Sequence, residues 1–440
     1  MVTLIKKFNY WLITMKIKNS FLNRRSFILG SSLAFSGVAK VFSKNTANKS
    51  HVVILGGGWG GLSAAKTLRL MNKNCKITLI EKTKEFISCP ISNWVIGQLI
   101  NMENITFDYE KFKRNNDIEV VIDEVISIDI NKKLISTNET SLKYDKLILS
   151  PGIQLDFSNI DGFKNSHKDS IFTAWKAGNE TLNFSKEIRN IENGDNIIIS
   201  IPLSPYRCPP GPYERTSLIA DYIKKNKINA KVIVLDANQK VVSKGSLFKK
   251  AWDELYKNII LYHSDSQIRA IDNKEKKVFT DFDEYRYKIL NIIPPQKAPN
   301  LLFKTGLIEK GRNWAPVNPY DFTSKYSNDI YIIGDSTDAS SIGSIPKSGY
   351  VAYSMGKVSG LASYYHLLGK EPPSPSMINT CYSLVSETEG ISVSAVYKFN
   401  KERNKIVTVD NASGLSPQRS NLIALNAWDW AQAIWKDMLT

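Results

Sequence analysis

The stretch His51-Val52-Val53-Ile54-Leu55-Gly56-Gly57-Gly58-Trp59-Gly60-Gly61 decides the fold, because it joins a strand pattern to a glycine-rich turn. Its β-branched start is typical of a buried parallel strand, and the helix-forming Leu62-Ser63-Ala64-Ala65-Lys66 follows it. Gly56 permits the tight turn, Gly58 lets the backbone approach a pyrophosphate, and Gly61 lets helix and strand pack closely. The helix amino terminus then faces the phosphates, so the stretch predicts a dinucleotide site.

A second strand supplies the acid that such a site needs. Lys76-Ile77-Thr78-Leu79-Ile80-Glu81 is apolar in its middle and ends at Glu81, twenty residues beyond Gly61. A carboxylate at that place accepts hydrogen bonds from a ribose 2′-hydroxyl. An ordinary glycine turn is the alternative, but the strand, the helix and the acid together favour the nucleotide site.

Two later strands indicate which nucleotide is bound. These apolar runs are Tyr144-Asp145-Lys146-Leu147-Ile148-Leu149-Ser150-Pro151-Gly152 and Ile330-Tyr331-Ile332-Ile333-Gly334-Asp335. In this order, the strands resemble those of the two-dinucleotide-binding-domain flavoproteins, the glutathione reductase-like class. The resemblance implies FAD, with Gly334 and Asp335 at its ribityl and pyrophosphate region. Taken alone, Asp335 is equally an ordinary acid at a strand end.

The middle of the chain has a nucleotide-fold pattern without its glycines. Asn196-Ile197-Ile198-Ile199-Ser200-Ile201 and Lys231-Val232-Ile233-Val234-Leu235-Asp236 are typical of its two strands. The first is followed by Pro202-Leu203-Ser204-Pro205-Tyr206-Arg207-Cys208-Pro209-Pro210-Gly211-Pro212, whose prolines lack the N–H groups that cradle a pyrophosphate. We therefore expect a second Rossmann-like domain that binds no NAD(P)H.

The length of 440 residues exceeds the roughly 250 to 300 that one hydrophobic core supports, so several domains are expected. The predicted fold class is α/β, with two Rossmann-like, glutathione reductase-like nucleotide-binding domains and an α+β C-terminal interface domain. The predicted divisions are 1–39, a signal peptide; 50–160 and 291–370, two parts of a FAD-binding domain; 161–290, the second Rossmann-like domain; and 371–440, the C-terminal domain.

The composition excludes several classes of function. The chain has 58 basic and 42 acidic residues and a net charge of +16, but seven of the basic residues lie in the first forty positions, which hold no acid. No recognition helix or aromatic-basic repeat accompanies the charge, so nucleic acid is not an expected partner. Four Cys and four His without zinc spacing predict neither a metal site nor a disulfide scaffold.

The amino terminus resembles a twin-arginine export signal. Arg24 and Arg25 stand directly before the apolar stretch 27–39, which is too short to span a bilayer. This predicts export of the folded protein to the periplasm, with cleavage near Lys40 and with Met15 as an alternative start. A membrane anchor and a chance arginine pair beside a buried helix are the weaker alternatives.

Five rarer segments resemble the flavoprotein chain of flavocytochrome c sulfide dehydrogenase, a relative of sulfide:quinone oxidoreductase. The likeness runs over nearly all of the chain from Val52 onward. The segments are Cys89-Pro90-Ile91-Ser92-Asn93, Arg207-Cys208-Pro209-Pro210-Gly211-Pro212-Tyr213-Glu214-Arg215, Asn291-Ile292-Ile293-Pro294-Pro295-Gln296, Pro346-Lys347-Ser348-Gly349-Tyr350 and Asn379-Thr380-Cys381-Tyr382-Ser383.

The resemblance implies a role for each of five residues. Cys89 matches the cysteine that ties FAD covalently, although alone it would more often be a small buried residue. Cys208 matches one of two cysteines of a redox disulfide, and Glu214 matches a proposed acid/base. Ser348 opens a predicted helix whose amino terminus stabilises negative charge on reduced flavin. Lys347 either adds a full charge there or is a solvated surface lysine.

The chain departs from the family where the second redox cysteine is expected. The family sequence is Gly-Asp-Ala-Cys, and this chain has Thr337 at the cysteine position. Cys75 and Cys381 are not obvious substitutes, because Cys381 matches a family position outside the redox pair. Several routes stay open: a sulfur anion attacks oxidised flavin or an already persulfidated Cys208, the natural substrate is another sulfur compound, or activity is lost.

The leading functional expectation is a periplasmic FAD enzyme that oxidises sulfide, or a related small sulfur anion, and reduces a c-type cytochrome subunit. The alternatives are a quinone-linked enzyme at the membrane and an inactive flavin- or sulfur-binding subunit. The segment Trp428-Asp429-Trp430-Ala431-Gln432-Ala433-Ile434-Trp435 is read first as core or interface packing. A cytochrome-docking surface and an amphipathic membrane contact are its other two interpretations.

Overall fold

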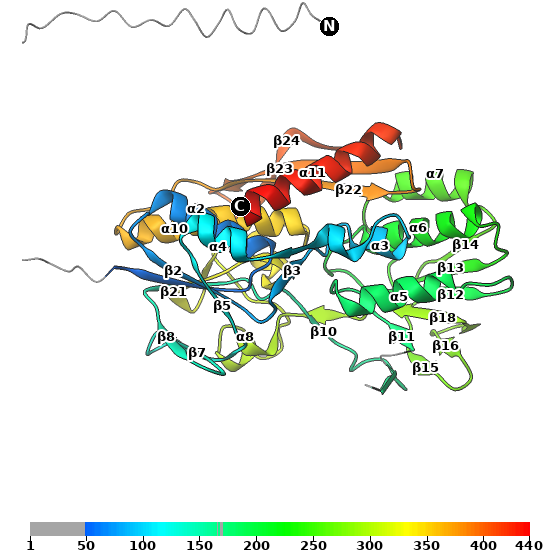
Figure 1. Ribbon diagram of the computed structural model, residues 1–440, viewed down its shortest axis with the longest axis horizontal. Helices are drawn as coiled ribbons and strands as arrows, with labels where there is room; N and C mark the ends of the chain where they lie inside the picture. The colour runs from blue at the N-terminus through cyan, green and yellow to red at the C-terminus, as the bar shows by residue number, and fades with distance from the viewer. Residues whose placement is uncertain (1–48, 165, 168–169) are drawn as a thin grey trace, which may run out of the picture. The chain divides into compact units, whose positions relative to one another are not determined.

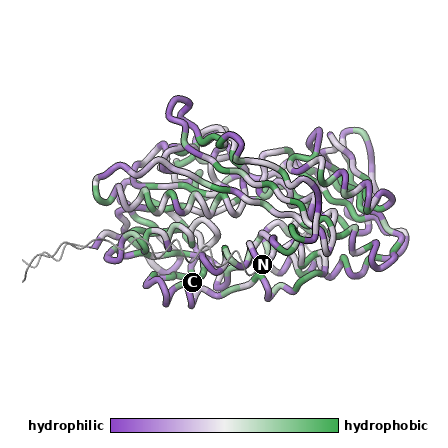
Figure 2. Tube along the Cα trace, turned by 90° about the horizontal axis from the view of Figure 1, so that it is seen from above, coloured by the Kyte–Doolittle hydropathy of each residue, from purple (hydrophilic) through white to green (hydrophobic). Residues whose placement is uncertain are grey.

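The computed structural model describes residues 49–164, 166–167 and 170–440. The expected export signal at 1–39 lies outside these residues. The predicted α/β class is confirmed: two mainly parallel sheets carry helices, and a third, antiparallel sheet follows at the C-terminal end (Figure 1). Hydrophobic segments gather along the inner strands and helices, and hydrophilic segments gather at the outer loops (Figure 2).

The first domain is built on a six-stranded sheet with the strand order β20-β21-β9-β1-β2-β5, parallel except for β20. Because β21 follows the second domain in the chain, two separate parts of the sequence form this sheet. The strands are β1 (His51–Leu55), β2 (Lys76–Glu81), β5 (Glu119–Ile122), β9 (Lys146–Leu149), β20 (Thr323–Ser324) and β21 (Ser327–Ile332).

Helices α2 (Trp59–Met71) and α10 (Gly349–Leu367) pack on each other beside this sheet (Figure 1). Their backbones approach closely, because a Cβ on Gly356 would lie 2.3 Å from the carbonyl oxygen of Gly60. This contact fixes the amino terminus of α2, which follows β1. It also fixes the amino terminus of α10, which follows the segment after β21.

Shorter elements complete the first domain. They are β3 (Glu85–Ile87), α3 (Ser92–Ile96), η1 (Met102–Ile105), β4 (Thr106–Asp108), α4 (Glu110–Asn116), β6 (Val125–Asp129), β7 (Leu134–Thr137), β8 (Ser141–Lys143), β10 (Gln154–Leu155), β19 (Gln296–Lys297), α8 (Asn300–Lys304), η3 (Gly334–Ser336) and α9 (Ala339–Ile342). Strands β6, β7 and β8 form a small antiparallel sheet, and β3 pairs with β4.

The second domain has a five-stranded parallel sheet with the order β11-β18-β12-β13-β14. Strands β12 and β13 have the bounds predicted from the sequence. The elements are β11 (Ile171–Phe172), α5 (Asn179–Arg189), β12 (Asn196–Ile201), α6 (Gly211–Lys225), β13 (Lys231–Asp236), α7 (Gly245–Leu255), β14 (Ile260–His263), β18 (Ile289–Ile292) and the hairpin strands β15 (Ala270–Asp272), β16 (Lys277–Phe279) and β17 (Glu284–Arg286).

The C-terminal segment forms the antiparallel sheet β22 (Ser376–Leu384), β23 (Gly390–Asn400) and β24 (Lys405–Leu415), followed by α11 (Asn421–Leu439). Trp430 on α11 stacks on Trp59 at 5.8 Å, and Trp428 stacks on Trp94 at 5.9 Å. The interpretation of these tryptophans as packing residues is therefore confirmed. Within the described part of the chain, every helix is too short or too polar to cross a membrane.

Candidate active site

The glycine turn between β1 and α2 has the geometry of a nucleotide cradle. A Cβ on Gly56, whose φ is +99°, would lie 2.3 Å from the carbonyl oxygen of Ser150, and one on Gly61 would lie 1.8 Å from that of Gly56. These two glycines are required by packing. A Cβ on Gly58 would instead have no heavy atom within 4 Å, so Gly58 borders open space where a ligand can approach the backbone.

Two adjoining cavities, of about 230 and 770 Å³, open beside this turn. Both are lined by Gly58, Glu81, Cys89 and Arg207, which makes them one continuous cleft. A cleft of this extent and shape suits a long dinucleotide. Across the described residues, no cluster of three or more His, Cys, Asp or Glu side chains is arranged to hold a metal ion.

Glu81 stands at the end of β2 on the wall of both cavities, as its sequence position predicts. Its Oε2 accepts a hydrogen bond of 2.7 Å from the N–H of Gly57, and its Oε1 accepts one of 2.9 Å from the N–H of Lys82. These bonds fix the carboxylate next to the glycine turn, where it can accept further bonds from ribose hydroxyls.

Asp335 in η3 lines the smaller cavity, and its buried Oδ1 has no hydrogen-bond partner in the described part of the chain. Burial raises the pKa of this carboxyl, and the charges of Arg207 and Lys347 act in the opposite direction. Leaving a buried acceptor unsatisfied costs about 1 to 3 kcal/mol, so this oxygen requires a donor from a bound molecule. The hydroxyls of FAD supply such donors.

Two indole groups on the same wall lack partners as well. The buried Nε1 atoms of Trp59 and Trp175 make no hydrogen bond within the described residues, and both side chains line the smaller cavity. The cavity thus offers an unsatisfied acceptor and two unsatisfied donors. Because FAD carries hydroxyl, carbonyl and ring-nitrogen groups, these residues fit the cofactor.

Cys89 lies between β3 and α3 and lines both cavities. Its Sγ accepts a hydrogen bond of 3.5 Å from the N–H of Ala177, which begins the approach to α5. The thiol is therefore held within the nucleotide cleft, at the boundary of the first and second domains.

Cys208 reaches the smaller cavity from the proline-rich loop of the second domain. Its φ of +56° is strained for a residue with a side chain, and its N–H donates to the carbonyl oxygen of Lys347 at 2.7 Å. Burial raises the pKa of its thiol, the nearby Cys381 and Glu214 raise it further, and the cations Lys244 and Arg207 lower it.

The amino terminus of α10 also borders the smaller cavity. Gly349 and Ala352 of its first turn line the wall, and the Ser348 side chain caps the helix by accepting a 3.1 Å bond from the N–H of Val351. Ser348 also donates to the side chain of Asn379 at 2.8 Å. The positive end of the helix dipole therefore stabilises negative charge in the cavity.

Lys347 is buried just behind this helix terminus. Its Nζ donates to the carbonyl oxygens of Asp335 at 2.7 Å and Thr337 at 2.6 Å, and it lies 3.8 Å from the centre of the Trp314 ring. Burial lowers its pKa to about 8, against the charges of Asp335 and Asp338. The surface-lysine interpretation is wrong, and the ammonium group binds loop carbonyls instead of lining the smaller cavity.

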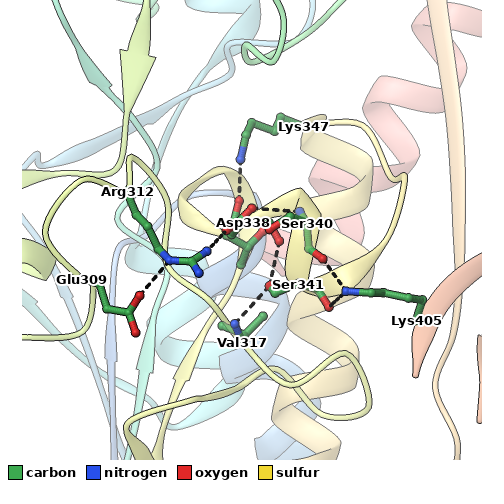
Figure 3. A network of polar contacts seen from close by, with 9 residues as sticks. Glu309, Arg312, Val317, Asp338, Ser340, Ser341, Lys347 and Lys405 are labelled. Atoms are coloured by element: carbon green, nitrogen blue, oxygen red, sulfur yellow. Dashed lines mark hydrogen bonds and ion pairs between the residues drawn. The ribbon is translucent and has the colours of Figure 1, made fainter. Parts of the chain in front are cut away.

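Thr337, at the position of the missing cysteine, is buried and donates to the carbonyl oxygen of Gly334 at 2.8 Å. The loop after it is held by Asp338, which accepts from Arg312 at 3.2 Å and from the N–H of Ser340 at 2.8 Å (Figure 3). The loop is thus fixed by its own polar network, and the Thr337 side chain is not among the residues that line the smaller cavity.

Glu214 lies on α6 and does not line the smaller cavity. Its carboxylate accepts hydrogen bonds from the side chains of Asn93 at 3.0 Å and Trp94 at 3.3 Å, and from the N–H of Leu384 at 2.9 Å. Burial raises its pKa. Glu214 therefore lies behind the wall of the smaller cavity, close enough for its charge to act on Cys208.

Arg215 is a cavity residue that the sequence analysis did not single out. It is 1% exposed, and its guanidinium donates to Asn291 at 2.8 Å and to the carbonyl oxygen of Thr173 at 3.0 Å. It also lies 5.0 Å from the Trp175 ring centre. Burial lowers its pKa to about 10. Its place at the end of the family-like segment 207–215 was a sequence signal that could have identified it.

The corresponding crevice of the second domain is filled by side chains. Asp236, at the end of β13, is fully buried and accepts hydrogen bonds from the hydroxyls of Tyr213 at 2.8 Å and Tyr262 at 2.9 Å. Its other oxygen accepts from the Asn238 side chain at 2.8 Å. The acid at this strand end is therefore saturated by protein donors.

Three family models match the chain in order. Residues 50–184 match the pyridine nucleotide-disulphide oxidoreductase family. Residues 181–294 match the central part of the sulfide dehydrogenase [flavocytochrome c] flavoprotein chain, and residues 373–439 match the flavocytochrome c sulphide dehydrogenase flavin-binding domain.

Curated proteins and a solved structure are also similar to the chain, and the structure shows that the fold is shared. The mitochondrial sulfide:quinone oxidoreductases of Dictyostelium discoideum and Mus musculus are 23% and 22% identical, over 66% of this chain and 66% of each protein. The matches thus span just under two thirds of those relatives. The sulfide:quinone oxidoreductase structure of Aquifex aeolicus has a TM-score of 0.71 at 18% identity, covering 89% of this chain and 91% of that one.

The matches, the two nucleotide-type sheets and the fit of FAD to the cleft support one assignment. The chain carries the central and flavin-binding domains of the flavocytochrome c sulfide dehydrogenase flavoprotein chain, behind a pyridine nucleotide-disulphide oxidoreductase domain.

Proposed function

We propose that the chain is a periplasmic FAD-dependent oxidoreductase that oxidises sulfide, or a related reduced sulfur anion, and passes the electrons to a c-type cytochrome. The observation that carries the proposal is the Cys208 thiol on the wall of the cavity that also contains the unpartnered Asp335 oxygen and borders the α10 amino terminus. A thiol on the wall of a flavin cavity suits the oxidation of a sulfur substrate, because the thiolate can bind the sulfur and the flavin can take the electrons.

FAD supplies a carrier that accepts two electrons and releases them one at a time. The backbone at Gly58 receives the pyrophosphate, Glu81 accepts from ribose hydroxyls, and Asp335 accepts from the ribityl chain. The α10 amino terminus stabilises the negative charge that accumulates on reduction. Each role uses a group that the structure leaves open toward the cleft.

With FAD bound, the Cys208 thiolate and hydrosulfide would form the sulfur–sulfur bond of a Cys208 persulfide, and the flavin would take up the two electrons and one proton. The thiolate is the reactive form of cysteine. The cations Arg207 and Lys244 favour that thiolate, and burial opposes it. Glu214 holds or releases the proton: its raised pKa brings its protonation closer to neutral pH, where an acid/base group is most effective. Thr337 forms no disulfide, so the chemistry rests on Cys208 without that partner.

We further propose that Cys89 carries the FAD through a covalent thioether. The thiol lies inside the nucleotide cleft and is fixed by the N–H of Ala177. Acid precipitation tests the linkage, since a covalent flavin sediments with the protein and a noncovalent flavin stays in solution. Cys89→Ser should release the flavin while Cys75→Ser should not.

Pyridine nucleotides are not part of the proposed reaction. In the second domain, prolines replace the glycine turn and Asp236 is saturated by tyrosine and asparagine donors. A ribose would therefore have to displace protein hydrogen bonds at the place where such enzymes bind it. Electrons then enter from the sulfur substrate.

A second candidate acceptor is membrane quinone. The similar relatives are named sulfide:quinone oxidoreductases, and α11 exposes Leu422 and Leu425, which are 65% and 66% exposed. Such a pair is small for a membrane surface, and apolar residues scattered singly are ordinary. The cytochrome remains the leading acceptor because the family models are those of a flavocytochrome.

The acceptor is tested by assaying the purified full chain anaerobically with sulfide and either cytochrome c or a soluble quinone. The proposal expects cytochrome c reduction that depends on sulfide, and expects the protein in the periplasmic soluble fraction. Quinone reduction without cytochrome reduction, together with sedimentation with membranes, would replace the cytochrome with quinone. No reduction of either acceptor would reject both enzyme proposals.

A further inference from the structure

A second thiol lies beside a buried cation on the far side of the Cys208 loop. Lys244, which precedes α7, is 4% exposed, and its Nζ donates to the carbonyl oxygen of Cys381 at 3.1 Å. The same Nζ lies 3.7 Å from the Cys381 Sγ and 2.9 Å from the Ser383 Oγ. In the function proposed above, Cys381 has no role, and Lys244 acts only through its charge, which lowers the pKa of Cys208.

The β22 strand directs Cys381 toward the active site. Side chains alternate along a strand, so Asn379, Cys381 and Ser383 share one face. Asn379 accepts from Ser348 at the α10 amino terminus, and Ser383 accepts from Lys244. The Cys381 side chain between them therefore projects into the space between the α10 terminus and α7.

Lys244 has no carboxylate within ion-pair distance in the described residues, and the carboxylate on which its charge acts, Glu214, lies farther away. A buried ammonium group without an adjacent anion is costly. Of the groups within hydrogen-bond distance of the Lys244 Nζ, only the Cys381 sulfur can become negative. The Cys381 sulfur is therefore the nucleophilic atom that the Lys244 ammonium group contacts, and the thiolate is the reactive form of cysteine.

Cys381 faces a separate cavity of about 470 Å³. Its other walls include Pro209, Pro210, Lys347 and Ser348, and it is partly open to solvent. Cys208 borders the flavin cavity on the other side of this wall, since it precedes Pro209 and its N–H is bound to Lys347. The Cys208 loop is thus a partition, with one thiol on each side.

The two thiols are close enough to interact. After burial, the charge of Cys381 is the largest cause that raises the pKa of Cys208. Both are free cysteines, so neither sulfur is tied up in a disulfide. Cys208 lines the flavin cavity and Cys381 lines the cavity that is partly open to solvent, so a transfer from Cys208 to Cys381 would carry sulfur toward solvent.

We propose that Cys381, activated by Lys244, is a second sulfur acceptor that takes the sulfane sulfur from a Cys208 persulfide and presents it to the solvent-side cavity. The Cys381 thiolate attacks the outer sulfur of the persulfide, a new sulfur–sulfur bond forms, and Cys208 leaves as a thiolate. The hydrogen stays on the transferred sulfur, and no electron enters or leaves. The step rests on the proposed function, which places sulfur on Cys208.

The test locates the sulfane sulfur by alkylation and peptide mass mapping of the FAD-containing full chain after anaerobic turnover with sulfide and cytochrome c. The wild type should carry the persulfide on Cys381. Cys381→Ser should retain it on Cys208 and slow steady-state turnover at least tenfold. Lys244→Met should reduce labelling of Cys381 at least tenfold, and Lys244→Arg should restore most of it.

Cys75→Ser is the matched control. Cys75 is another buried thiol, donating to the carbonyl oxygen of Ser50 at 3.2 Å and lining neither cavity, so this variant should behave like the wild type. A wild type labelled only on Cys208, or Cys381 labelling that is unchanged in Lys244→Met, would overturn the proposal.

Loading with sodium tetrasulfide separates this inference from the proposed function, because tetrasulfide delivers sulfane sulfur without flavin chemistry. If sulfide turnover is absent but tetrasulfide labels Cys381 in a Lys244-dependent manner, the function fails and the second acceptor stands. If turnover is present and tetrasulfide leaves Cys381 unlabelled, the second acceptor fails and the function stands.

Discussion

Burial sets the chemistry of individual residues around the flavin cavity. It raises the pKa of Cys208 and of Asp335, and it lowers the pKa of Lys347 to about 8. These shifts oppose charge formation on all three groups. The bound flavin, the substrate and the neighbouring cations therefore decide whether each group is charged or neutral. Sequence patterns identify such residues but not their burial, which depends on the packed structure.

Cys208→Ser should abolish turnover with sulfide and leave the flavin bound. The hydroxyl is a poor nucleophile for sulfur, whereas the residues that fit FAD are unchanged. Sulfide-dependent reduction of cytochrome c and the visible flavin spectrum measure the two effects, with Cys75→Ser as the control. Unchanged turnover in Cys208→Ser would remove this thiol from the mechanism.

Asp335→Asn should weaken FAD retention about tenfold or more. The variant loses a negatively charged acceptor whose Oδ1 has no protein partner in the described residues, so the loss falls on the cofactor. Flavin content after dialysis against potassium bromide measures it in a Cys89→Ser background, in which the flavin is held without the covalent bond. Asp338→Asn is the control, because Asp338 bonds within its own loop; equal flavin content in both variants would refute the assigned role of Asp335.

Lys347 should make stability depend on pH in the alkaline range. Its pKa is about 8 in the folded protein and about 10.4 in the unfolded chain, so the unfolded state binds the proton first as pH falls. As the pH falls from about 10.4 to about 8, the wild type therefore loses stability relative to Lys347→Met. Urea unfolding at pH 7 and pH 10 measures this difference, and a pH-independent difference would contradict it.

At the scale of elements, the β1–turn–α2 unit is the part that the sequence predicts most fully. Strands β1, β2, β12 and β13 have the predicted bounds, because buried parallel strands have continuous apolar runs. An α+β C-terminal domain was predicted, but not the strands of the β22–β24 sheet, because small and polar residues break the alternation of these consecutive hairpin strands. Glu214 was predicted as a site residue, but its position behind the wall depends on that sheet, which supplies the N–H of Leu384.

Two glycines of the β1–α2 turn allow folding and cofactor binding to be tested separately. Gly61→Ala places a Cβ 1.8 Å from the Gly56 carbonyl oxygen and should lower the free energy of unfolding by about 3 kcal/mol or more. Gly58→Ala meets no neighbour and should fold normally, yet lose flavin because the methyl group occupies the approach to the backbone. Thermal unfolding and flavin content report the two effects. Full flavin retention in Gly58→Ala would contradict the cradle.

At the scale of the whole molecule, the active-site cavity is assembled from two domains. The first domain contributes the glycine turn and Asp335, and the second domain contributes Cys208. Strand β22 places Cys381 at the separate cavity on the other side of the Cys208 loop. The family resemblance identified Cys208 from a rare segment of sequence, whereas the strand and glycine patterns identified the glycine turn and Asp335. It did not indicate that Cys208 and Cys381 flank one partition, because that relation arises only when the sheet and the proline-rich loop pack together.

The central claim is that this chain houses a flavin reduced by sulfur and not by a pyridine nucleotide. Anaerobic titration of the purified protein, first with NADH and then with sulfide, tests it through the visible absorbance of the flavin. The account predicts a yellow protein whose absorbance is unchanged by NADH and bleached by sulfide. A colourless protein, or rapid bleaching by NADH, would contradict it.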